Sequence, residues 1–111
     1  MPETRCYMIV IGEIFDRDKF LSGYATVVPP LVEKFGGRYI IKGAGGEFLE
    51  NGICDNPSAL VSEWPSREAA KRFWDSPEYA EAIKLREGIG RFQVMLIDST
   101  PAKPSSTAIA S

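Results

Sequence analysis

The stretches RCYMIVIGEI, residues 5–14, and RFQVMLIDS, residues 91–99, decide the fold of this chain. Both are rich in apolar and β-branched residues, and each predicts a β-strand. Neither alternates between apolar and polar side chains, because residues 7–11 and 94–97 are apolar without interruption. Strands of this kind have to be covered on both faces of their sheet.

The segment between the first strand and residue 37 predicts a helix. Asp16 offers an N-cap, and apolar residues then recur at spacings of three and four as far as Phe35. The pair Pro29-Pro30 falls inside this pattern. We therefore expect it to kink the helix or to split it, with Pro30 at the first position of a second piece. The pair Gly36-Gly37 ends the helix.

The rest of the chain again supplies strands and helices. Residues 38–44 and 59–64 predict strands, and a short extra strand is expected at residues 47–50. Ser66 caps a short helix, and Ser76-Pro77-Glu78 begins another that runs to about residue 87. The order β-α-β-(β)-β-α-α-β is typical of the ferredoxin-like plait, an α+β fold with an antiparallel sheet and helices on one face.

Two-sided strands and one-sided helices together imply a partner. The helices cover one face of the sheet, and a second copy of the same sheet is the simplest cover for the other. We therefore expect a homodimer. Residues 1–99 form its single domain, and residues 100–111 are expected to be a disordered tail, because they lack periodicity and large apolar side chains.

Composition excludes several classes of protein. The chain has 111 residues, enough for one domain, and its 13 Lys and Arg against 15 Asp and Glu give a net charge of −2. No basic excess exists to neutralise a phosphate backbone, so we expect no nucleic-acid partner. The longest uncharged apolar stretch, residues 6–12, is too short to span a bilayer. We expect a cytoplasmic protein with no membrane partner.

Histidine is absent, and the two cysteines are Cys6 and Cys54. The absence excludes histidine metal sites, a proximal histidine for haem, and Ser-His or Cys-His nucleophile pairs. Two cysteines cannot form a Cys₄ zinc site, and in a reducing cytosol we do not expect them to form a disulfide. We expect neither a metal nor a cofactor.

Four motifs together resemble a known family. They are Gly36-Gly37-Arg38-Tyr39, Ser62-Glu63-Trp64-Pro65-Ser66, Phe73-Trp74-Asp75-Ser76-Pro77-Glu78-Tyr79 and Leu85-Arg86. Over residues 5–99 the chain resembles a bacterial family of small domains of unknown function in the dimeric α/β-barrel superfamily. The usual pattern of that family is Gly-Gly-Arg, Glu-Phe-Pro-Ser, Ser-Pro-Glu-Tyr and Arg. Trp64 stands where the pattern has phenylalanine, and Lys42 where arginine is common.

The resemblance implies a dimeric α/β barrel and leaves the reaction open. The superfamily includes cofactor-free monooxygenases, muconolactone-type isomerases, polyketide cyclases, haem-degrading enzymes and dye-decolourising peroxidases. We expect a small cofactor-independent enzyme of isomerase, lyase or cyclase type. It would act by acid–base chemistry on a small acidic or aromatic molecule, in a pocket between sheet and helices. The alternatives are a non-catalytic dimeric ligand-binding or stress-associated module, a cofactor-free monooxygenase, and a structural dimer whose pocket is filled by Trp and Tyr.

Acid–base chemistry without histidine has to use carboxyl, phenol, amine or thiol groups. Glu63 lies in an otherwise apolar strand, where burial would raise its pKa toward that of a general base. The alternative role for Glu63 is as the structural partner of an arginine. Tyr24 lies on the apolar face of the first predicted helix and is a candidate hydrogen-bond or proton donor, or else a core residue.

The candidate substrate-binding residues are Arg38, Arg86, Tyr79 and Trp64. Arg86 follows Tyr79 by seven residues, which places both on one face of a helix, and Arg38 opens a strand directly after the glycine pair. An inward-facing guanidinium needs an anion. That anion is either a protein carboxylate such as Glu63 or a substrate carboxylate or enolate. Tyr79 and Trp64 are candidates for the pocket wall, with core or dimer packing as their alternative roles.

Overall fold

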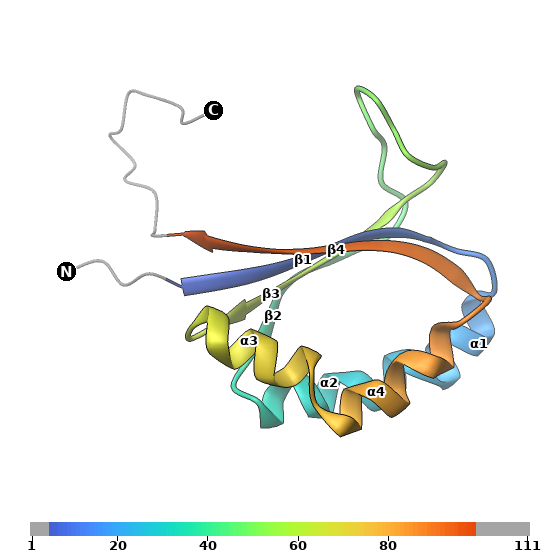
Figure 1. The fold of residues 1–111 in the computed structure, drawn as a ribbon. Helices are drawn as coiled ribbons and strands as arrows, with labels where there is room; N and C mark the ends of the chain where they lie inside the picture. Colours follow the sequence, from blue (N-terminus) through green and yellow to red (C-terminus); the bar gives the residue numbers. More distant parts are fainter. Residues whose placement is uncertain (1–4, 100–111) are drawn as a thin grey trace, which may run out of the picture.

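The structure, a computed structural model, describes residues 5–99, so the predicted tail at residues 100–111 lies outside the described residues. The strands β1 (Arg5–Ile14), β2 (Arg38–Gly43), β3 (Ser58–Trp64) and β4 (Gly90–Ser99) form one antiparallel sheet in the order β2-β3-β1-β4. The helices are α1 (Arg17–Ser22), α2 (Tyr24–Lys34), α3 (Arg67–Trp74), α4 (Pro77–Ala82) and the 3₁₀ helix η1 (Ile83–Arg86). Figure 1 shows the sheet as one layer and the helices as a second layer on one of its faces. The predicted ferredoxin-like plait is confirmed.

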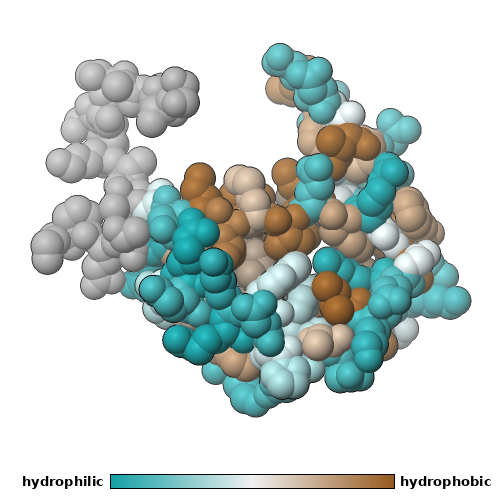
Figure 2. Space-filling view, in the orientation of Figure 1, coloured by the Kyte–Doolittle hydropathy of each residue, from teal (hydrophilic) through white to brown (hydrophobic). Residues whose placement is uncertain are grey.

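The other face of the sheet carries apolar side chains that no helix covers. Met8 on β1 is buried under the helices, so its neighbour Ile9 points away from them, because side chains alternate along a strand. The register places Ile9 opposite Val61 on β3 and Met95 on β4. We call this surface the open sheet face; its apolar residues are Ile9, Ile11, Ile41, Val61, Met95 and Ile97. Figure 2 shows hydrophobic side chains gathered along the side of the sheet away from the helices.

The first helical region is divided at Gly23, not at the proline pair. Asp16 caps α1 through a hydrogen bond from the backbone N–H of Lys19, as predicted, and Gly23 separates α1 from α2. Pro29 and Pro30 lie inside α2, which continues through both of them. The prediction that this pair splits the helix is therefore wrong. The stripe of buried side chains Tyr24, Val28 and Val32 holds α2 against the sheet on both sides of the prolines. This packing offsets the cost of about 3 kcal/mol that an interior proline imposes on an isolated helix.

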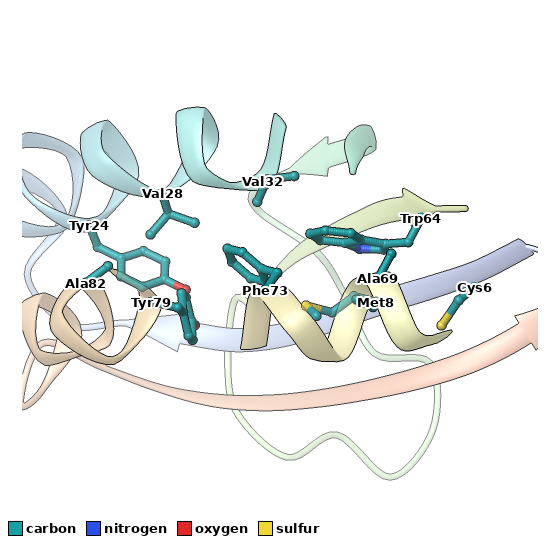
Figure 3. Close-up of a cluster of buried hydrophobic side chains, with 11 residues drawn as sticks. Cys6, Met8, Tyr24, Val28, Val32, Trp64, Ala69, Phe73, Tyr79 and Ala82 are labelled. Carbon is teal, nitrogen blue, oxygen red and sulfur yellow. The ribbon is translucent and has the colours of Figure 1, made fainter. Parts of the chain in front are cut away.

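The core lies between the sheet and the helices, as Figure 3 shows. Its largest fully buried side chains are Trp64 and Phe73, whose ring centroids are 5.1 Å apart. The glycine pair before β2 serves this packing. Gly36 has a φ of +95°, which favours glycine, and a Cβ on Gly37 would come within 2.8 Å of the Trp64 ring.

The extra strand expected at residues 47–50 does not form. Residues 44–57 are a loop without regular structure, which Figure 1 shows projecting from the end of the sheet on the side away from the helices. Positive φ angles at Gly45 and Asn51 turn the backbone on either side of this segment, so an extended stretch cannot continue in either direction. Within residues 5–99, no helix has the length and apolar character needed to cross a membrane.

Candidate functional site

A cavity of about 460 Å³ lies between the first two helices and the sheet. Its volume is within the usual range for small-molecule sites. Residues of α1 and α2 form one wall, and residues of all four strands contribute to the other. The lining is mostly apolar and aromatic, and includes Val10, Ile14, Phe20, Leu21, Val28 and Phe92.

Two buried tyrosines from different helices meet beside this cavity. Tyr24 of α2 lines the cavity, and its side chain points toward that of Tyr79 of α4 (Figure 3). The two hydroxyl oxygens are 2.6 Å apart. Burial raises the pKa of both phenols above the ordinary value near 10, so both stay protonated at neutral pH. One hydroxyl hydrogen is used between them, and the other is left to donate to a ligand. The pair is therefore a hydrogen-bond donor and not a base.

A smaller chamber of about 20 Å³ adjoins the cavity at this point. Tyr24, Tyr39 and Arg86 line both spaces, and Tyr79 lines the chamber. Burial is also the main reason why the pKa of Tyr39 is raised to about 12, with the neighbouring Tyr79 contributing less. Sequence reasoning missed Tyr39. Its place in the Gly-Gly-Arg-Tyr motif, at the start of a strand, is the signal that could have found it.

Arg86 is held at the cavity by aromatic rings instead of by an acid. Its guanidinium carbon lies 5.3 Å from the ring centroid of Tyr24 and 4.7 Å from that of Phe92. In the described part of the chain no ion pair joins Arg86 to a carboxylate. Stacking engages the faces of the guanidinium and leaves its N–H edges for a ligand. The structure thus brings together three of the predicted residues, Tyr24, Tyr79 and Arg86.

Glu63 does not face this cavity, so the prediction that it lies in the pocket between sheet and helices is wrong. Ser62 and Trp64 on either side of it are buried under the helices, and alternation turns Glu63 to the open sheet face. There it accepts hydrogen bonds from Tyr7, 2.8 Å from the phenol oxygen, and from Arg38, 2.9 Å from Nε. These two bonds lower the pKa of Glu63, the opposite of the shift expected for a general base.

Two predicted substrate-binding residues lie elsewhere as well. Arg38 is on the same side of the sheet as Glu63 and forms an ion pair with it, which is the first of the two expected roles. The prediction that Arg38 binds substrate together with Arg86 is therefore wrong. Trp64 is fully buried, donates a hydrogen bond to Ser62 Oγ at 2.9 Å, and packs on Phe73. It belongs to the core and does not line the cavity.

We expect the replacement Glu63→Gln to leave the fold intact and to remove the contribution to stability that comes from the ionised carboxylate and therefore varies with pH. The carboxylate has a lowered pKa in the folded protein, so it stabilises the fold above the ordinary value near 4.5 and loses this effect as the pH falls through the lowered value. The melting temperature of the variant should lie below that of the wild type at pH 7, and the gap should narrow as the pH falls below 4.5.

Glu50→Gln is the matched control, because Glu50 is an exposed carboxylate in the loop at residues 44–57. Its melting temperature should follow that of the wild type at both pH values. A gap for Glu63→Gln that stays constant with pH would contradict the assignment of Glu63 to an ion pair.

Among residues 5–99, no three His, Cys, Asp or Glu side chains lie together in a way that could hold a metal ion. Cys6 is buried beside Asp98, and burial is the main reason that its pKa is raised. Cys6 and Asp98 are not among the described residues that line the cavity, where the polar side chains carry hydroxyl or cationic groups.

The fold defines the class of this protein: it is an α+β domain with the ferredoxin-like arrangement of four antiparallel strands and helices on one face. Residues 5–100 match the family model described as Domain of unknown function (DUF1330), and the chain belongs to this family. The comparison with curated proteins gave no match.

Two solved structures illustrate the likeness. The RPA0582 protein of unknown function from Rhodopseudomonas palustris is 21% identical with a TM-score of 0.71, and the alignment covers 92% of this chain and 85% of that one. SnoaB, a cofactor-independent oxygenase from Streptomyces nogalater, is 13% identical with a TM-score of 0.62, and the alignment covers 93% of this chain and 99% of that one. At such identities the likeness establishes the shared fold.

Proposed function

We propose that this protein is a small cofactor-independent enzyme that stabilises the anionic form of a small acidic or aromatic substrate in the cavity between sheet and helices. One observation carries the proposal: a buried pair of phenol hydroxyls lies at the same end of an apolar cavity as Arg86, which has no carboxylate partner among residues 5–99. Donors placed in this way stabilise negative charge as it develops on a reacting oxygen.

The described residues give this chemistry a specific form. Arg86 and one hydroxyl of the Tyr24–Tyr79 pair would bind an enolate or phenolate oxygen, and an apolar cavity strengthens both interactions. No Asp or Glu is among the described residues lining the cavity. The substrate would therefore lose its proton to water. In an isomerase reaction a proton from water would return at another atom; in a lyase reaction the electron pair would expel a leaving group that takes up that proton. In a cyclase reaction the pair would form the new ring bond to a carbonyl carbon, whose oxygen takes up the proton.

A cofactor-free monooxygenase is the second candidate. An electron-rich anion held by the same donors can react with O₂ directly, and SnoaB, described as a cofactor-independent oxygenase, has a similar fold. A non-catalytic ligand-binding module is the third candidate, because the part of the chain that the structure describes places hydrogen-bond donors and no carboxylate at the cavity.

One experiment separates these candidates. Small aromatic acids and enolisable ketones are incubated with the protein in D₂O, and exchange of their acidic C–H protons is followed by NMR while an electrode records O₂. Exchange without O₂ uptake supports the acid–base enzyme, and O₂ uptake supports the monooxygenase. Compounds that bind but show neither would contradict an enzyme and favour the binding module.

For the active compounds, we expect Tyr79→Phe to lower the turnover rate by about 10²–10³-fold, the usual effect of removing one oxyanion donor. The control is Tyr7→Phe, which removes a phenol hydroxyl on the open sheet face and should keep the wild-type rate. A Tyr79→Phe variant with full activity would exclude the tyrosine pair from the reaction.

We also propose that two copies pair through their open sheet faces. The support is an apolar surface that the helices leave uncovered, on which the side chains of Ile41 and Met95 are 53% and 52% exposed in the single chain. Soluble monomers rarely expose a contiguous apolar surface of this kind.

A further inference from the structure

The charged groups at the cavity all have the same sign. Arg17, Lys42 and Arg86 line it, and no acid does so among the described residues. The chain as a whole has a net charge of −2, so the cavity is locally opposite in sign to the molecule. A pocket of this kind attracts anions and disfavours cations.

The three cations are not equivalent. Arg17 and Lys42 are exposed, where solvent and salt screen their charge, and the ammonium of Lys42 lies 5.4 Å from the centroid of the Tyr39 ring. Arg86 is half-buried and lies between two rings. Arg86 is thus the one cation of these three whose charge solvent and salt screen little. A single such charge suits a ligand with a single negative charge.

The walls and the inner chamber define the rest of the ligand. Aromatic side chains line the cavity, namely Phe20, Tyr24, Tyr39 and Phe92, and they favour a flat aromatic body. The chamber beside Arg86 measures about 20 Å³. That volume holds about one water-sized atom, so it admits one carboxylate oxygen and excludes a phosphate group.

We infer that the ligand of this cavity is an aromatic monocarboxylate, and that Arg86 is the residue that selects its charge. The flat guanidinium pairs with a carboxylate through two parallel N–H···O bonds, and the Tyr24–Tyr79 pair donates a third. The inference rests on the proposed function for the location of the site. It concerns binding alone and is tested without turnover.

The test compares 2-naphthoate with 2-naphthamide, which has the same rings and a neutral head of nearly the same shape. Affinities of the full-length protein for both are measured by isothermal titration calorimetry at pH 7. We expect naphthoate to bind at least about 10-fold more tightly. Arg86→Gln should weaken naphthoate by at least about 10-fold and change the affinity for naphthamide by less than about 3-fold.

Two further variants control the result. Arg72→Gln makes the same change in net charge at an exposed position on α3 away from the cavity, and it should alter neither affinity. Ala25→Trp places a large side chain into the cavity from α2 and should abolish binding of both compounds. If Arg86→Gln does not fold, Arg86→Lys keeps the charge but lacks the planar pair of donors, and it should still weaken naphthoate selectively.

Equal wild-type affinities for the two compounds would overturn the inference. Equal weakening of both by the Arg86 variant, or binding that survives Ala25→Trp, would also overturn it. The proposed function fails on a different result, namely the absence of both proton exchange and O₂ uptake. If the protein selects naphthoate but shows neither reaction, this inference stands and the proposal of an enzyme fails.

Discussion

Met95→Asp is expected to convert the proposed dimer into a monomer. Met95 lies on β4 opposite Ile9, at the open sheet face, and is half exposed in the single chain. The single chain therefore tolerates an aspartate there, whereas a two-fold interface would bury two carboxylates without partners. We expect the dissociation constant of the dimer to rise by at least about 100-fold. Sedimentation velocity at micromolar concentration should give twice 12.3 kDa for the wild type and 12.3 kDa for the variant.

Leu85→Asp is the matched control for this change. Leu85 is an apolar residue of η1, on the helical side of the molecule, and is 44% exposed. The same substitution there should leave the dimer intact. Dissociation by Leu85→Asp and not by Met95→Asp would show that the interface lies on the helical side. A monomeric wild type would contradict the proposed homodimer.

The second large effect is on stability, where Phe73→Ala should cost about 3–5 kcal/mol. Phe73 is 2% exposed, and its ring centroid lies within 4.6–6.1 Å of those of Tyr79, Trp64 and Phe35. Truncation removes the contacts of the Phe73 ring with these three rings and leaves a cavity behind. Small domains are stable by about 5–15 kcal/mol, so the loss is a large part of the total.

Urea unfolding at one fixed protein concentration measures the loss, because pairing of two copies would make stability depend on concentration. Phe15→Ala removes an equal ring from a position that is 60% exposed, and it should change the free energy of unfolding by less than about 1 kcal/mol. Similar losses for the two variants would show that the Phe73 ring cluster is not the main stabilising contact of this layer.

Much of the fold follows from local sequence because its signals are local. Asp16, Ser66 and Ser76 each cap a helix through the side-chain oxygen, at the positions that the sequence indicates. Runs of β-branched residues mark the four strands, and their order defines the plait. Tyr79 and Arg86 do lie beside the same chamber, as their spacing of seven indicated, although the α-helix ends at Ala82 and Arg86 belongs to the 3₁₀ helix η1.

The helix boundary between α1 and α2 depended on packing. Local propensity favours a break at Pro29-Pro30, yet the chain breaks at Gly23. The buried stripe that includes Val28 and Val32 spans the prolines, and its contacts with the sheet outweigh the local preference.

The sequence by itself determined the fold class, the strand order and an apolar sheet that needs a cover on both faces. Only the tertiary structure decided which face each side chain of β3 occupies. A strand that is apolar at both Leu60 and Val61 carries no alternation to indicate its buried side, so the position of Glu63 was open. Packing of Trp64 under α3 turns the even-numbered residues toward the helices, which sends Glu63 to Arg38 on the open sheet face and leaves the cavity to Tyr24, Tyr79 and Arg86.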